Sequence, residues 1–105
     1  MVYFKQEARA DLQDIFEALL NWETENKQRI MTYETVIKYH NDILDTCESL
    51  DTVTYNRKAT YSQHKKHGEY IHQYKRNSRT SWYIIYNKLG QHVYIEKIIN
   101  NYKTL

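Results

Sequence analysis

The chain has 105 residues and a mass of 12.9 kDa, which is enough for one domain spanning residues 1–105. Apolar residues make up 41% and charged residues 27%, and the mean hydropathy is −0.87. No apolar run approaches the ~20 residues of a membrane-spanning helix, and acidic residues interrupt the first twenty positions, where a secretory signal would need an apolar core. Cys47 is the single cysteine, which excludes an internal disulfide. We therefore expect a one-domain cytoplasmic protein.

Charge is divided unevenly along the chain. Residues 1–51 carry five Lys/Arg and eleven Asp/Glu, which gives a net charge of −6. Residues 52–105 carry ten Lys/Arg and two Asp/Glu, which gives a net charge of +8. A basic half of this kind is typical of proteins that contact a polyanion. Nucleic acid is the first candidate partner and an acidic protein segment is the second. The alternative is that the basic half only keeps the surface solvated.

The first half of the chain predicts a short strand followed by two helices. Residues 2–4 are apolar and long enough only for a brief strand. Apolar residues then recur at helical spacing over residues 6–25 and again over residues 32–50, where Thr32 is the expected N-cap. The polar residues 24–31 link the two helices, which predicts an antiparallel helical hairpin. Cys47 lies on the apolar stripe of the second helix, so we expect it in the core.

The second half predicts a basic loop and three strands. Residues 51–69 are polar and basic, with a short helical turn expected at residues 58–64. The β-branched and aromatic content predicts strands at residues 70–75, 81–86 and 93–99. Turns are expected at residues 76–79 and 87–90, and a polar tail at residues 100–105. The predicted fold is therefore α+β with the order β-α-α-β-β-β, a helical hairpin packed on a small antiparallel sheet. Trp82, Ile84 and Tyr86 are expected on the face under the helices.

Three segments resemble a known protein family. Residues 7–15 are similar to its opening helix, written E-A-x-x-D-L-x-x-I, and residues 82–86 are similar to its Y-R-I-I-Y strand. Residues 93–99 are similar to its closing strand. With the small size and the order of elements, the chain resembles the RelE/ParE superfamily of toxins from bacterial toxin–antitoxin modules over nearly its whole length.

This resemblance implies one of two activities. RelE-like members cut messenger RNA in the ribosomal A site, and ParE-like members inhibit DNA gyrase without cutting anything themselves. A cognate antitoxin, commonly encoded beside the toxin, binds and masks both kinds. We therefore expect a toxin that blocks translation as a ribosome-dependent, metal-free mRNA endoribonuclease, with the antitoxin, the ribosome and mRNA as partners and no cofactor. The alternatives are a ParE-like inhibitor whose partner is DNA gyrase and a catalytically inactive relative.

The chain departs from the family pattern at several site positions. Tyr83 stands where the nuclease branch usually has Arg, and Lys97 stands at an Arg position of the closing strand. Asn100 lies near the usual His position, and Tyr102 lies just beyond it. These differences leave three interpretations open: a rearranged nuclease site, a gyrase-type toxin, or a toxin that has lost its activity.

The residue types themselves indicate candidate roles in RNA cleavage. Attack by the 2′-hydroxyl needs a group that accepts its proton, cations that stabilise the charged phosphorane, and an acid for the leaving 5′-oxygen. Arg79 and Lys97 are the candidate catalytic cations, and Tyr102 and His72 are the candidate proton-transfer groups. Because an ordinary tyrosine has a pKa near ~10, Tyr102 would serve more readily as an acid than as a base.

Further residues are candidates for holding nucleic acid. Cationic side chains would bind phosphates, and tyrosine rings would stack on unpaired bases. Tyr61 is a further candidate for stacking, because it lies in the basic half of the chain. The predicted nucleic-acid-binding residues are Lys65, Lys66, Tyr74, Lys75, Arg76 and Tyr83. The structural alternatives are a solvated turn at residues 75–79, sheet packing for Tyr83 and a structural role for His72. His64 and His67 have the spacing of a metal-binding pair, but no third ligand lies nearby in the sequence, so no metal site is expected.

Overall fold

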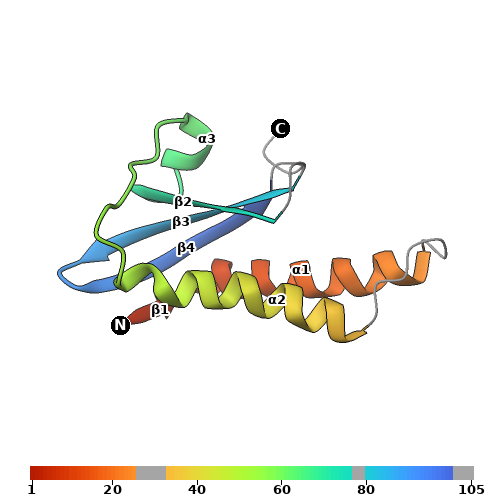
Figure 1. Cartoon of the computed structure of the whole chain (residues 1–105). Helices are drawn as coiled ribbons and strands as arrows, with labels where there is room; N and C mark the ends of the chain where they lie inside the picture. Colours follow the sequence, from red (N-terminus) through yellow and green to blue (C-terminus); the bar gives the residue numbers. More distant parts are fainter. Residues whose placement is uncertain (26–32, 77–79, 101–105) are drawn as a thin grey trace.

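A computed structural model describes residues 1–25, 33–76 and 80–100 of the chain (Figure 1). The elements, in chain order, are β1 (Val2–Phe4), α1 (Gln6–Glu25), α2 (Tyr33–Glu48), the 3-10 turn η1 (Ser49–Asp51), α3 (Ser62–Lys65), β2 (Tyr70–Lys75), β3 (Ser81–Leu89) and β4 (His92–Asn100). The predicted α+β class is confirmed. The expected N-cap Thr32 lies outside the described residues. In the described ranges, none of the helices has the length and apolar character needed to cross a membrane.

The four strands form one sheet in the order β1-β4-β3-β2. β2, β3 and β4 pair antiparallel, as the short connections predict. β1 instead runs parallel to β4, with Val2 opposite Val93 and Phe4 opposite Ile95. The sheet is therefore mixed, and the prediction of a wholly antiparallel sheet is wrong at this edge. The long helical connection that follows β1 permits this direction, which a tight turn would not.

The hairpin between β3 and β4 is longer than predicted. β3 continues past residue 86 to Leu89, and β4 begins at His92, so only Gly90 and Gln91 connect them. Gly90 has a φ of +63°, a conformation that glycine adopts without steric cost. The register shifts between Ile85 and Tyr86, where Glu96 is the extra residue on β4.

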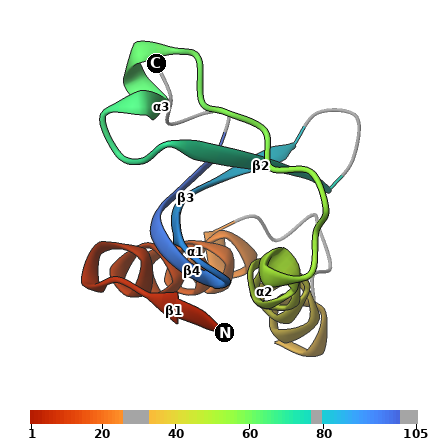
Figure 2. The same ribbon diagram turned by 90° about the vertical axis from the view of Figure 1, so that its left-hand side faces the viewer.

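The main core lies between the sheet and the pair α1–α2 (Figures 1 and 2). Trp82, Ile84 and Tyr86 alternate along β3 and are all buried on this side, as predicted. We call this the helix face of the sheet. It packs against residues of both helices: Ala8, Leu12, Ile15, Tyr39, Ile43 and Cys47. The prediction that Cys47 is a core residue is confirmed, because its side chain is fully buried.

The opposite side of the sheet, the outer face, carries a second and smaller cluster. Ile71 and Ile85 are buried there together with Ala59 from the segment before α3, and Tyr83 packs beside them. α3 lies on this side, across the sheet from α1 and α2 (Figures 1 and 2). Gly68 allows the chain to run close over β3, because a Cβ at this position would lie 2.9 Å from Ile85 Cγ2. The short helix that was predicted at residues 58–64 is present as α3, shifted toward the C-terminus.

Candidate nucleic-acid interface

The two sides of the sheet differ sharply in the charge of the elements that cover them. α1 and α2 together carry ten acidic and only two basic residues. Residues 57–69, which cover part of the outer face, carry four basic residues and one acidic residue. These charged residues are Arg57, Lys58, Lys65, Lys66 and Glu69. The sheet therefore separates an acidic helical layer from a basic layer, and a polyanion would be attracted to the basic one.

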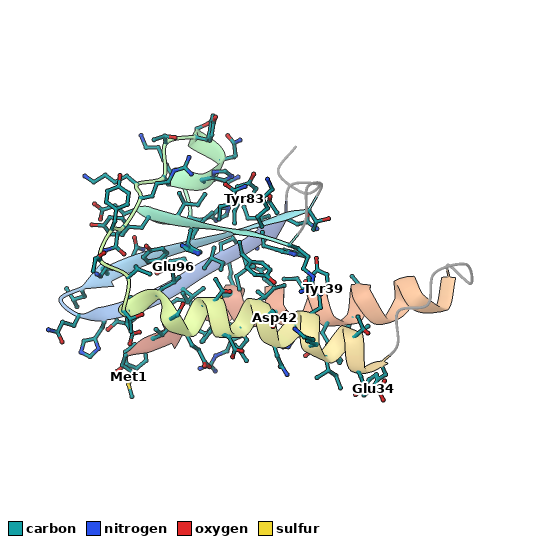
Figure 3. The ribbon with its side chains drawn as sticks, viewed as in Figure 1. Met1, Glu34, Tyr39, Asp42, Tyr83 and Glu96 are labelled. Atoms are coloured by element: carbon teal, nitrogen blue, oxygen red, sulfur yellow. The ribbon has the colours of Figure 1, made fainter. Side chains whose placement is uncertain are left out.

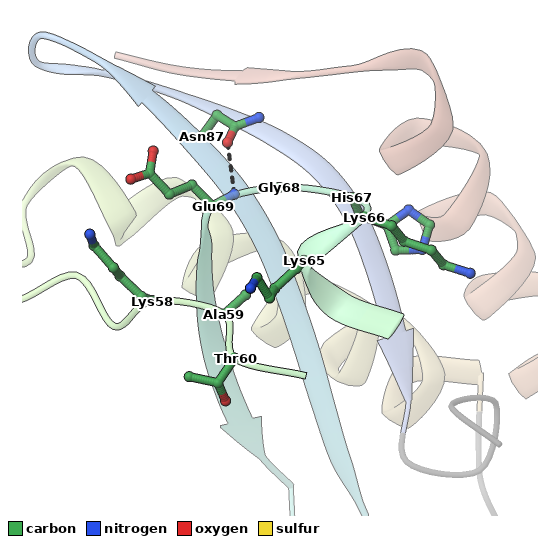
Figure 4. A pocket seen from close by; sticks show the side chains of 9 residues that line it. All are labelled: Lys58, Ala59, Thr60, Lys65, Lys66, His67, Gly68, Glu69 and Asn87. Carbon is green, nitrogen blue, oxygen red and sulfur yellow. Dashed lines mark hydrogen bonds between the residues drawn. The ribbon is translucent and has the colours of Figure 1, made fainter. Parts of the chain in front are cut away.

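An open basic pocket of about 680 Å³ lies in this outer layer (Figure 4). Lys58, Lys65, Lys66 and His67 are among the residues that line it. Burial lowers the pKa of His67, and the nearby cations Lys66 and Lys97 lower it further. His67 is therefore uncharged at neutral pH, and the positive charge of the pocket comes from its lysines.

Asn87 fixes one wall of the basic pocket to the sheet. Its Oδ1 accepts a hydrogen bond of 2.8 Å from the backbone N–H of Glu69, the contact drawn in Figure 4. Its Nδ2 donates at 3.2 Å to Oε2 of Glu96, the bulged residue of β4. The segment that carries the pocket lysines is thus attached to both β3 and β4, which gives those cations a defined place on the outer side.

A second pocket of about 200 Å³ lies between α3 and the outer face, and we call it the His64 pocket. It is lined by Arg57, Thr60, Tyr61, His64, Gln73 and Tyr83, with Ile71 beside them. The His64 ring is stacked on Tyr83, with 5.2 Å between the ring centroids, and it meets Tyr61 edge-on at 5.8 Å. Tyr83 therefore has the sheet-packing role that was one of its two predicted alternatives, with His64 on one face of its ring.

His64 has an unusual environment for a polar side chain. It is only 5% exposed, and its Nε2 has no hydrogen-bond partner among the described residues. Burial lowers the pKa of His64, and electrostatic interactions with His67, when His67 is protonated, and with the guanidinium of Arg57 lower it further. The imidazole is therefore neutral at pH 7 and can accept or donate one hydrogen bond through Nε2, depending on its tautomer.

Lys97 is joined to α1 by an ion pair. Its Nζ lies 2.9 Å from Oδ1 of Asp11, and the other carboxylate oxygen of Asp11 accepts a 2.9 Å hydrogen bond from the backbone N–H of Ile98. Asp11 therefore bonds to the side chain of Lys97 and to the backbone of Ile98. Both residues belong to the part of β4 that extends beyond its pairing with β1. A phosphate group that approached Lys97 would have to compete with this carboxylate.

His72 lies on the other side of the sheet from Lys97. His72 is paired with Ile84 across β2 and β3, so it belongs to the helix face, whereas Lys97 is paired with Ile85 of the outer face. Burial lowers the pKa of His72. The other two predicted catalytic residues, Arg79 and Tyr102, lie outside the described residues. The structure thus does not bring together the two predicted catalytic residues that it describes.

The predicted nucleic-acid-binding residues also divide between the two faces. Lys65 and Lys66 are exposed in the outer layer, and Lys75 is exposed on β2, paired with Ser81. Tyr83 lies on the outer face as well, as Figure 3 shows. Tyr74 packs against the main core on the helix face. Four of the six residues therefore lie on the basic side of the sheet.

Arg76 connects the end of β2 to α2. Its Nη1 lies 2.9 Å from Oδ2 of Asp42, and its guanidinium carbon lies 4.3 Å from the centre of the Tyr39 ring. The Oη of Tyr39 accepts a 3.0 Å hydrogen bond from Nε1 of Trp82. Figure 3 shows Tyr39 and Asp42 on α2, away from Tyr83. These contacts give Arg76 a structural role on the helix side, and nucleic-acid binding by Arg76 stays a prediction.

The sequence does not indicate that Arg57, His64 and Gln73 meet at one pocket. The spacing of His64 and His67 suggests only a metal-binding pair. In the described ranges, no group of three or more His, Cys, Asp or Glu residues is placed to hold a metal ion. The alternation of β2 and β3 does indicate which of their residues share a face, but the pairing of Gln73 with Tyr83 depends on a register that the sequence does not specify.

No family model, curated protein or solved structure matches this chain. Its function must therefore be inferred from its residues and their arrangement. The outer side offers lysines for phosphate groups, a Tyr61 ring that is 62% exposed, and a buried imidazole with an unused nitrogen. This combination of cations and aromatic rings is suited to a single-stranded nucleic acid.

Proposed function

We propose that this protein is a toxin of a RelE/ParE-like toxin–antitoxin module and acts as a ribosome-dependent, metal-free mRNA endoribonuclease. In this proposal the outer side of the sheet contacts RNA in the ribosome, and a cognate antitoxin masks that side until it is removed. The site of action is the cytoplasm, where ribosomes and messenger RNA are found. No cofactor is required, because cationic side chains can stabilise the charged phosphorane.

The order of the elements supports the proposal. A first strand, a helical hairpin and three further strands follow one another as the family resemblance implies, with α3 placed in the connection between α2 and β2. We propose that this β-α-α-β-β-β order reflects membership of the superfamily. Fold alone does not determine activity, so the functional proposal rests on the site.

The observation that carries the proposal is the basic and aromatic layer on the outer face. Lys65 and Lys66 are exposed there, and the exposed ring of Tyr61 comes four residues before Lys65 in the chain. The opposite layer of helices is strongly acidic. A highly charged RNA would therefore be oriented with respect to the protein before any specific contact forms.

A second candidate function is inhibition of DNA gyrase by binding without catalysis, as ParE-like toxins do. The pairing of Lys97 with Asp11 favours it, because this pairing reduces the charge that Lys97 can offer to a phosphorane. The position of His72 on the helix face favours it as well. A catalytically inactive RNA-binding relative would share these features.

Mapping of cleavage in a purified translation system tests the proposal. A message is translated with added protein and its 5′ ends are mapped by primer extension, for the wild type and for Lys97→Ala and Tyr102→Phe. The exposed Lys38, on the acidic side, supplies the control Lys38→Ala. The proposal predicts cuts within codons that require ribosomes, that persist in the control and that are lost in the two site variants once these are shown to be folded.

The other outcomes separate the alternatives. Undiminished translation with no cuts would contradict the nuclease proposal, and loss of DNA supercoiling by gyrase in the presence of the protein would then identify the second candidate. If neither translation nor gyrase is affected, both proposed activities are contradicted, and binding of RNA without cleavage is the alternative to test next.

A further inference from the structure

The His64 pocket contains a buried polar atom that the described part of the fold leaves without a partner. His64 is 5% exposed, and its Nε2 makes no hydrogen bond to any described residue. A polar group that is removed from water without a hydrogen bond destabilises the folded state, so such groups are uncommon in folded proteins. The backbone N–H of His64 donates to the carbonyl of Tyr61, which holds the residue in α3. This bond does not involve the side chain, so it gives Nε2 no partner.

The walls of the pocket combine aromatic, amide and cationic groups. Tyr61 and Tyr83 present rings from α3's N-terminal flank and from β3. Gln73 presents an amide whose Nε2 donates to Ser81 Oγ at 3.1 Å, which holds the amide against the outer face. Arg57 supplies a positive charge at the same pocket. Flat rings, an amide edge and a guanidinium are the groups with which proteins bind a nucleobase and its phosphate.

The size of the pocket limits the occupant. Its volume of about 200 Å³ is below the ~300–1,000 Å³ that drug-sized ligands occupy. One flat heterocyclic ring would fit, with the sugar and phosphate outside. Tyr61 is 62% exposed and can cover such a ring, whereas Tyr83 is already stacked on His64.

We propose that the His64 pocket binds one nucleobase of a single-stranded RNA, with the base against Tyr61, its hydrogen-bonding edge at His64 Nε2, and the adjoining phosphate near Arg57. This inference rests on the proposed function, because it assigns a base-binding subsite to the same outer side. It goes beyond that function in naming the residues that receive the base and in separating them from the lysines that bind phosphates. Base binding here requires no ribosome.

Binding of short RNAs to the full-length protein tests the inference directly. The probes are fluorescently labelled hexaribonucleotides of each base, and a ribose-phosphate hexamer without bases, which has the same phosphates. The inference predicts that at least one base-containing hexamer binds roughly 5- to 160-fold more tightly than the abasic one, the range expected for stacking of a single base. Equal affinity for the two kinds of probe would overturn it, because phosphates alone would then account for binding.

Two variants locate the base, and a third is the control. Tyr61→Ala removes the covering ring, and His64→Phe keeps a ring on Tyr83 but removes the nitrogen; both should bring the affinity for the base-containing hexamer toward that for the abasic one. Tyr55→Ala changes a tyrosine of the same segment that is 80% exposed and does not line the pocket, and it should have no effect. Unchanged affinity in both site variants would overturn the inference.

The test distinguishes failure of the subsite from failure of the proposed function. If the hexamers bind through Tyr61 and His64 but the protein leaves translation undiminished, the subsite stands and the nuclease proposal fails. A different pair of results would leave the nuclease proposal standing and show the subsite to be wrong. In that case the protein cuts messages on ribosomes, but the two variants bind the hexamers as tightly as the wild type does, and the abasic hexamer binds as tightly as the base-containing ones.

Discussion

Asp11 and Lys97 form the ion pair that attaches α1 to the edge of the sheet. The 2.9 Å contact between Asp11 Oδ1 and Lys97 Nζ is accompanied by the 2.9 Å hydrogen bond from Ile98 N–H to Asp11 Oδ2. The carboxylate thus satisfies a backbone donor of β4 that β1 is too short to reach. Both side chains are largely shielded, with exposures of 13% for Asp11 and 26% for Lys97, which makes the pair stronger than one at an open surface.

Removal of this carboxylate should destabilise the fold. Asp11→Ala leaves the N–H of Ile98 and the ammonium of Lys97 without their partner, and we expect a loss of about 2 kcal/mol in the free energy of unfolding. Asp14→Ala, which changes an exposed acid of the same helix, is the matched control and should have little effect. Urea denaturation measures both values. Equal stability of the two variants would show that the contacts of Asp11 with Lys97 and Ile98 do not stabilise the fold.

The hydrogen bond between α2 and β3 gives a second prediction. Tyr39→Phe keeps the ring under the guanidinium of Arg76 but removes the acceptor for Trp82 Nε1, a buried donor. We expect a loss of about 1–2 kcal/mol in the free energy of unfolding. Tyr33→Phe removes the hydroxyl of an exposed tyrosine on the same helix and serves as control. A destabilisation as small as that of the control would show that water replaces the bond.

Stability should fall as the pH falls through the histidine range. Burial lowers the pKa of His72 from its ordinary value of 6.5, so the unfolded chain binds a proton there at a higher pH than the folded chain does. The contribution is fully present above pH 6.5 and is lost progressively below it, because proton uptake then favours the unfolded state. His72→Gln should weaken this dependence.

The measurement is the free energy of unfolding from about pH 8 to about pH 5. His92→Gln, which changes an exposed histidine at the start of β4, is the matched control. If the wild type and His72→Gln lose stability in parallel over this range, His72 does not contribute to the pH dependence.

Cys47 should resist thiol reagents in the folded protein. Burial raises the pKa of the Cys47 thiol to about 12, and the nearby Glu48 adds to this effect. The reactive thiolate is therefore scarce at pH 8, and the side chain has no exposed surface. Labelling with a chromogenic disulfide reagent should be slow in buffer and fast in denaturant. Rapid labelling of the folded protein would show that α2 is not packed as described.

The sequence predicted the features that depend on local periodicity. The helical spacing of apolar residues indicated both helices, and the alternation along β3 placed Trp82, Ile84 and Tyr86 on the face under them. The direction of β1 was not predictable in this way, because pairing of Val2 with Val93 depends on how the intervening helices return the chain. The apolar pattern gives no such information.

The candidate site was predicted less well for a physical reason. Lys97 and Asp11 are 86 positions apart, and only the packing of α1 against β4 brings them together. Lys97 therefore looked like a free cation in the sequence. The stacking of His64 on Tyr83 likewise depends on how residues 57–69 cover the outer face. That segment has no apolar periodicity from which its position could be inferred.

The most direct test of the proposed function is ribosome binding by charge-reversed variants. Lys65→Glu with Lys66→Glu reverses two exposed cations of the outer layer, and Lys5→Glu with Arg9→Glu makes the same change in net charge at the start of α1. We predict that the wild type and the α1 variant sediment with translating ribosomes and arrest translation, whereas the outer-layer variant does neither. Equal binding by the two variants, or no binding by the wild type, would contradict the claim that the basic outer layer contacts ribosomal or messenger RNA.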